Sequence, residues 1–304
     1  MTETPAPAAA IRAAFADAGV TGWLHALDLD TGAELDWHAD ELVVTASVHK
    51  LPLLVALHEQ AAAGALDLTE QIDIRPHGRT AGPTGLAAMQ DAARLSLRDL
   101  AYLMMSVSDN ASADLLLARV GLDTVNRTTI RLGLTRTRAQ HSFATMMAMV
   151  REDAGPGGAQ ALADPHVIAR LRALDPAQTN RSTPRELTRL LAAIWNDTAG
   201  TAEHCAAIRR LMSLQVWPHR LASGFPFDDV HVAGKTGSLP TLRNEIGVVE
   251  YPDTGRYAIA VFTRTVRTAA ILPAADAVIG TAARIAVDTL RAHGHRPSAP
   301  EPLQ

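Results

Sequence analysis

The sequence predicts an α/β fold of the α+β type. An antiparallel sheet is built from both ends of the chain and flanked by the terminal helices, and an all-helical domain is inserted between them. Strand-like segments occur near the N-terminus and again after residue 217, whereas residues 66–217 look mainly helical. The 304 residues, 47% of them hydrophobic, are enough for a large core. We expect an α/β subdomain at 1–45 and 218–292, a helical subdomain at 46–217 and a disordered tail at 293–304.

The N-terminal region predicts a helix followed by a hairpin. Residues 11–18 alternate apolar and polar side chains at helical spacing and end at Gly19. Strand candidates at 22–29 and 34–37 flank the turn sequence DLDTG. A second helical run extends from about Ser47 to Ala63, where Gly64 suits a helix C-cap.

Capping signals place helices in the middle of the chain. Ser96 precedes the apolar run LAYLMM as an N-cap. Thr183 gives a stronger signal, because Pro184 fits the first helical position and Glu186 can reach back to the cap. The remaining elements are a helix at 202–214, strands at 230–233, 245–250 and 256–263, and a final amphipathic helix at about 274–292.

The composition argues against several classes of protein. Lys plus Arg is 28 and Asp plus Glu is 32, giving a net charge of −4, and aromatics are 4%, so we expect no nucleic-acid partner. The single cysteine, Cys205, and the scattered histidines predict no disulfide, no metal and no other cofactor. We find no signal peptide or membrane span, which favours a cytoplasmic protein, or an exported one if the start is trimmed.

The stretch TASVHKLPLL carries a potential nucleophile. Ser47 and Lys50 are three residues apart and share one face of a helix. If burial or a second cation lowers the lysine pKa from about 10.4, the neutral amine can take the Ser47 proton. Pro52 belongs in a first turn, so backbone N–H groups at the helix start would face a developing oxyanion. Taken alone, the pair also fits two ordinary helix residues.

Two further stretches contain residues that suit the same chemistry. In SVSDNASADLLL, Ser108 would carry a proton to a leaving group and Asn110 would donate to a substrate amide, although these residue types are also common helix caps. In HVAGKTGSLP, Lys235 would lie beside Ser108 and bind a substrate carboxylate, although a lysine beside a turn is also ordinary. Gly237 would let a substrate run along the strand.

The order S-x-x-K, S-D-N, K-T-G resembles the serine β-lactamase and penicillin-binding protein superfamily, and class A β-lactamases in particular. The resemblance covers about residues 8–290, including RSTPRELTRLL and HRLASGFPFDDVHVAGKTGS. It implies a β-lactamase/transpeptidase-like fold and a serine hydrolase that is acylated at Ser47 by a β-lactam or a related amide or ester. The backbone N–H groups of Ser47 and Ser238 would form the oxyanion hole. The implied catalytic residues are Ser47, Lys50, Ser108 and Lys235, and the implied substrate-binding residues are Asn110, Thr236, Gly237, Ser238, Arg220 and Arg243.

The resemblance breaks in the loop that follows the Ser-Asp-Asn element. Class A enzymes carry a glutamate there, in a Glu-x-x-Leu-Asn stretch, which activates the water that hydrolyses the acyl-enzyme; this sequence lacks the stretch. His141 falls near that place by spacing, and a neutral histidine can act as a base near pH 7. Glu152 and Asp153 are the alternatives. If none of them acts, the acyl group is released slowly.

Three functions therefore remain open. The first is a hydrolase that turns over a β-lactam or similar compound. The second is a penicillin-binding, acyl-transferase or esterase-like protein that keeps its acyl group. The third is a non-catalytic relative, which the intact triplets argue against, since buried charged groups cost stability. In each active case the partner is a small-molecule β-lactam, ester or peptide amide, and we expect a monomer.

Overall fold

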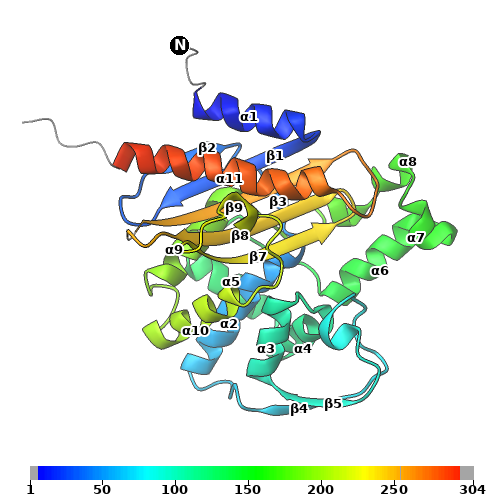
Figure 1. The fold of residues 1–304 in the computed structure, drawn as a ribbon. Coiled ribbons are helices and arrows are strands. Elements are labelled where there is room, and N and C mark those ends of the chain that lie inside the picture. Colours follow the sequence, from blue (N-terminus) through cyan, green and yellow to red (C-terminus); the bar gives the residue numbers. More distant parts are fainter. Residues whose placement is uncertain (1–5, 254, 295–304) are drawn as a thin grey trace, which may run out of the picture.

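The structure is a computed structural model that describes residues 6–253 and 255–294. Its centre is a five-stranded antiparallel sheet in the order β2-β1-β9-β8-β7 (Figure 1). As predicted, the strands come from both ends of the chain, and the predicted fold class is confirmed. The strands are β1 (Val20–Asp28), β2 (Glu34–Trp37), β7 (His231–Leu239), β8 (Leu242–Glu250) and β9 (Arg256–Thr265).

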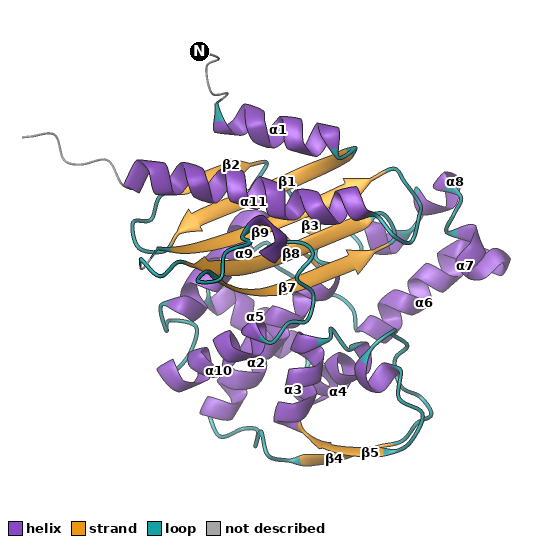
Figure 2. Cartoon of the chain, in the orientation of Figure 1, coloured by secondary structure: helices purple, strands orange, loops and turns teal. Residues whose placement is uncertain are grey.

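Helices cover both faces of this sheet (Figure 2). The terminal helices α1 (Pro7–Asp17) and α11 (Pro273–Gly294) lie side by side on one face, and α9 (Pro184–Trp195) packs on the other. Strand side chains alternate between the two faces, so Ile259 and Val261 face the terminal helices while Ala260 and Phe262 face α9 and the helical part. The sheet is therefore buried on both sides.

The remaining helices form the part of the molecule that packs under α9 and β7. Helix α2 (Lys50–Ala62) runs through its centre and is buried from Lys50 to His58. No described helix is long and apolar enough to cross a membrane. The other helices are α3 (Leu97–Ser106), α4 (Asn110–Val120), α5 (Leu122–Arg131), α6 (Phe143–Ala154), α7 (Gly158–Ala161), α8 (Pro165–Ile168) and α10 (Ala202–Ser213).

The structure differs from the sequence prediction in three details. Residues 235–237 lie inside β7 and do not follow it, because pairing with β8 extends the strand to Leu239. Thr183 caps α9 as expected, but the Glu186 carboxylate accepts a hydrogen bond from Thr137 Oγ1 at 2.6 Å. The mainly helical middle also contains two short strand pairs, β3 (Val43–Val44) with β6 (Arg181–Ser182) and β4 (Gln71–Ile74) with β5 (Ala93–Ser96).

Residues 295–304 of the expected disordered tail lie outside the described residues.

A close backbone contact sets the position of α11. A Cβ atom added to Gly280 would lie 2.5 Å from the Arg220 carbonyl oxygen and 2.6 Å from the Gly224 nitrogen, so only glycine fits there without movement. The same contact brings Asp276, one turn earlier on α11, to the Arg220 side chain, whose Nε donates to Oδ1 at 2.7 Å. The packing of α11 therefore also places Asp276 beside Arg220.

Gly280→Ala should lower the free energy of unfolding by about 1–3 kcal/mol, because the added methyl group overpacks a rigid backbone contact. Thermal or urea unfolding followed by circular dichroism measures the change. Thr281→Ala is the matched control, since Thr281 is exposed on the same helix. Equal midpoints for the two variants would contradict the account of this contact.

Candidate active site

Ser47 lies in a short 3₁₀ turn, Ala46–His49, that leads directly into α2. Ala46 has a φ of +48°, a left-handed conformation that costs a non-glycine residue about 1–3 kcal/mol. Thr45 anchors the turn on one side by donating its backbone N–H and its hydroxyl to Asn180 O, at 3.1 and 2.9 Å. Ser47 thereby faces a cavity of about 570 Å³.

Lys50 is buried and lies beside Ser47, as the three-residue spacing predicts. Its Nζ is 3.2 Å from Ser47 Oγ and 3.3 Å from Ser108 Oγ, and it donates to Ser108 O at 2.7 Å and to Asn110 Oδ1 at 2.8 Å. None of these partners is charged. Burial lowers the lysine pKa to about 7, against the opposing influence of Asp109 and Asp114. Near neutral pH a large fraction of this amine is uncharged and able to accept a proton.

Ser108 lies between two amines. Lys235, also buried, donates to Ser108 Oγ at 2.9 Å and to the Thr236 carbonyl at 2.9 Å. The pKa of Lys235 is well below its ordinary value because of burial and the nearby Lys50. Lys50 and Lys235 are the two lysines of the sequence. Ser108 Oγ is therefore within hydrogen-bond distance of both amines.

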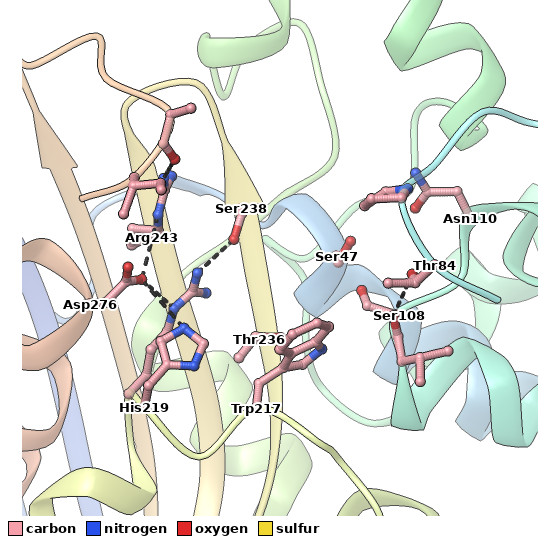
Figure 3. Close-up of a pocket in the computed structure, with 15 residues that line it drawn as sticks. Ser47, Thr84, Ser108, Asn110, Trp217, His219, Thr236, Ser238, Arg243 and Asp276 are labelled. Atoms are coloured by element: carbon pink, nitrogen blue, oxygen red, sulfur yellow. Dashed lines mark hydrogen bonds and ion pairs between the residues drawn. The ribbon is translucent and has the colours of Figure 1, made fainter. Parts of the chain in front are cut away.

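Two arginines also line the cavity, Arg220 and Arg243, and Figure 3 shows Arg243 across the cavity from Ser47. Arg220 donates to Ser238 Oγ at 2.7 Å and to the Gly237 and Asn244 carbonyls at 3.0 Å. Arg220 Nε lies 2.7 Å and Arg243 Nε 3.5 Å from Asp276 Oδ1. Two guanidinium groups facing one carboxylate leave a net positive edge, which suits an anionic part of a ligand.

Strand β7 approaches the Ser47 turn very closely. A Cβ atom on Gly237 would lie 2.7 Å from the Thr45 carbonyl and 3.2 Å from the Val48 nitrogen. Glycine is required here by the contact between strand and turn, a reason that the sequence analysis did not give. Thr236 and Ser238 line the cavity beside it, together with Trp217, which the sequence analysis missed.

The histidine considered as a base is held elsewhere. His141 Nε2 lies 3.0 Å from the Gln178 carbonyl, and His141 is not among the described residues that line the cavity. Glu152 and Asp153 both bind Arg172, at 2.8 Å each. No carboxylate or imidazole from this loop is hydrogen-bonded to Lys50 within the described part of the chain.

Phe143 occupies the place beside Lys50. Its buried ring has its centroid 4.4 Å from Lys50 Nζ. Asp114 fixes this position, because its carboxylate accepts from the Phe143 N–H at 2.8 Å and from the Ala144 N–H at 2.7 Å. Sequence reasoning missed Phe143 because it searched the loop for a base. Asp114 is the residue that could have indicated this arrangement. It lies four residues after Asn110, so both side chains are on the same face of α4.

Within residues 6–253 and 255–294, no group of three or more His, Cys, Asp or Glu side chains is arranged to hold a metal ion.

Comparison with known proteins identifies similar sequences and structures. The profile of the Beta-lactamase enzyme family matches residues 6–290. The beta-lactamase regulatory protein BlaB of Streptomyces cacaoi is 35% identical over 92% of this chain and 96% of its own length. A β-lactamase from Sphaerobacter thermophilus superposes with a TM-score of 0.76 at 27% identity, covering 95% of this chain and 98% of that one. A PBP-A mutant in an acyl-enzyme complex with penicillin G gives a TM-score of 0.76 at 20% identity, over 94% and 96% of the two chains, which shows the shared fold.

Lys50 should titrate near pH 7, charged below this value and neutral above it. Carbon-13 labelling of the lysine Cε atoms tests this directly, because a protein with two lysines gives two side-chain signals. Lys235→Arg assigns the signals by removing one of them. A Lys50 midpoint at the ordinary value of about 10.4 would contradict the proton-accepting role.

Proposed function

Because the chain belongs to the beta-lactamase enzyme family, we propose that it is a serine protein that β-lactams acylate at Ser47 and that releases the acyl group only slowly. One observation carries this proposal. The Lys50 amine faces Ser47 Oγ at 3.2 Å, while an aromatic ring, and not a carboxylate, covers its other side. The first contact supports acylation, and the second argues against rapid hydrolysis.

Acylation follows from the groups in the cavity. Neutral Lys50 takes the proton of Ser47, and the oxygen attacks the carbonyl carbon of the lactam. The backbone N–H groups of Ser47 and Ser238 stabilise the oxyanion. Ser108, within 3.3 Å of Lys50, transfers the proton to the leaving nitrogen as the ring opens. Lys235 and Arg220 provide positive charge for the carboxylate of the substrate.

Deacylation needs a second base, because a water molecule must lose a proton as it attacks the ester. A phenyl ring accepts no proton and excludes water from the space beside Lys50. His141, Glu152 and Asp153 are engaged by Gln178 and Arg172. The acyl-enzyme is therefore long-lived, although Lys50 itself supports some slow hydrolysis.

A role as a β-lactam sensor is a second candidate function. It is favoured by the 35% identity to a protein named as a β-lactamase regulator. A protein that stays acylated is suited to reporting the presence of a compound, whereas fast turnover would erase the signal. In this case the acylated form must differ from the free form in what it binds, and the acyl-enzyme is the species to test.

Incubation with nitrocefin should give a colour burst of about one equivalent, followed by little further change, and intact-mass spectrometry should show a persistent adduct. Ser47→Ala should abolish both signals, because the nucleophile is lost. Sustained turnover would support the hydrolase alternative. Cleavage of a p-nitrophenyl ester without a nitrocefin adduct would indicate an esterase.

Phe143→Glu should shorten the life of the adduct by about 10²–10⁴-fold, the usual contribution of a general base, since the new carboxylate lies beside Lys50. Phe143→Leu is the matched control: it keeps the site apolar and should leave the adduct persistent. Adduct decay followed by mass spectrometry distinguishes the two variants. Equal lifetimes in both would show that Phe143 does not limit deacylation.

A further inference from the structure

Glu245 carries a buried carboxylate on β8, the strand paired with β7, and takes no part in the reaction proposed above. Glu245 is on β8, opposite Thr236, and is 1% exposed. Since side chains alternate along a strand, it leaves the sheet on the face opposite to that of Lys235. A Cβ atom on Gly234 would lie 2.9 Å from Glu245 Oε1, so the missing side chain at 234 makes room for the carboxylate.

The contacts of Glu245 connect both cation-bearing segments of the cavity. Its Oε1 accepts from Gln215 Nε2 at 2.6 Å, and its Oε2 accepts from the Leu221 N–H at 2.7 Å. Gln215 in turn accepts from the Thr236 N–H at 2.6 Å. One carboxylate thus ties β8 to the free edge of β7 and to the residue next to Arg220. A buried carboxylate is costly unless hydrogen bonds of this kind offset the loss of water.

Glu245 also supplies negative charge to a positive site. The charged groups that act on Lys235 are Lys50, Arg220 and Glu245, and among the described residues Glu245 is the one that favours the protonated amine. The groups that act on Glu245 are Arg220 and Lys235, with hydrogen bonds from Leu221 and Gln215. Burial raises the pKa of Glu245 to about 7, so above this pH the carboxylate is charged and favours the protonated form of Lys235.

We propose that Glu245 is a positioning residue of this site. It holds β7, which carries Lys235, and the segment of Arg220 and Leu221 in place, and it supplies negative charge near Lys235. The inference rests on the proposed function, in which Lys235 receives the carboxylate of the substrate. Glu245 does not touch the substrate: it acts through Gln215, Leu221 and Lys235.

Lysine Cε carbon-13 titration of Glu245→Gln tests the electrostatic part without any substrate. The Lys235 midpoint should move to lower pH, because the amine loses its supporting charge. The Lys50 midpoint should move less, since Glu245 is not among the groups that act on Lys50. Glu186→Gln is the matched control, because it replaces another buried carboxylate and should leave both midpoints unchanged. An unchanged Lys235 midpoint in folded Glu245→Gln would overturn the proposal.

Acylation by a fluorescent penicillin provides the second measurement. Above pH 8, Glu245→Gln should weaken the initial binding step about tenfold, the value of one charge-assisted hydrogen bond, with a smaller effect on the maximal acylation rate. The difference from wild type should shrink towards pH 6, where Glu245 is protonated. An equal loss at all pH values would indicate a purely structural role and would count against the proposal.

Two further outcomes are separable. If Glu245→Gln does not fold, Gln215→Leu removes one donor to the carboxylate, disfavours its charged form and should move the Lys235 midpoint in the same direction. If wild-type protein is not acylated at all, the proposed function fails, whereas the lysine titration still decides whether Glu245 supports the charge of Lys235.

Discussion

The structure depends on two amines that are buried on either side of one serine hydroxyl. Lys50 and Lys235 reach Ser108 Oγ at 3.3 and 2.9 Å. Two like charges this close are costly in a buried site, so burial lowers the pKa of both amines and the nearby Lys50 lowers that of Lys235 further. The hydrogen-bond partners of Lys50 are neutral oxygens, and its carboxylate neighbours Asp109 and Asp114 act only from a distance. Burial therefore dominates, and the pKa of Lys50 is lowered to about 7.

The carboxylates near the site also hold the elements that carry its cations in place. Asp109 accepts from the N–H groups of Leu86 and Ala87 and caps α4, which fixes the turn that holds Ser108. Asp276 and Glu245 hold the Arg220 segment from α11 and β8. Close backbone contacts at Gly237 and Gly280 bring these elements together. The position of the charged groups of the cavity therefore depends on how β7, β8 and α11 pack together.

The sequence was most informative where chemistry is local. The three-residue spacing of Ser47 and Lys50, the cap at Thr183 and the strand signals at both chain ends all predict what the structure contains. The strand character of Lys235 was not predictable, because a glycine-rich segment becomes a strand only by pairing with β8. Phe143 was hidden for a related reason: its contact with Lys50 depends on Asp114, which lies 29 residues earlier in the chain. Glu245 reads as part of an ordinary strand until its partners Gln215 and Leu221 are known.

In the proposed function, acylation and deacylation depend on different groups, which come from different elements of the fold. The acylating set, Ser47, Lys50 and Ser108, is held by α2 and by the turn before α4, whereas Phe143 belongs to α6 and meets Lys50 from the other side. A general base contributes about 10²–10⁴-fold to a rate, or roughly 3–5 kcal/mol of barrier. Replacing a base by a phenyl ring therefore lengthens the life of an acyl-enzyme by this factor without disturbing the nucleophile. In the proposed function, Phe143 at the start of α6 is therefore the side chain that separates a protein that hydrolyses its ligand from one that keeps it.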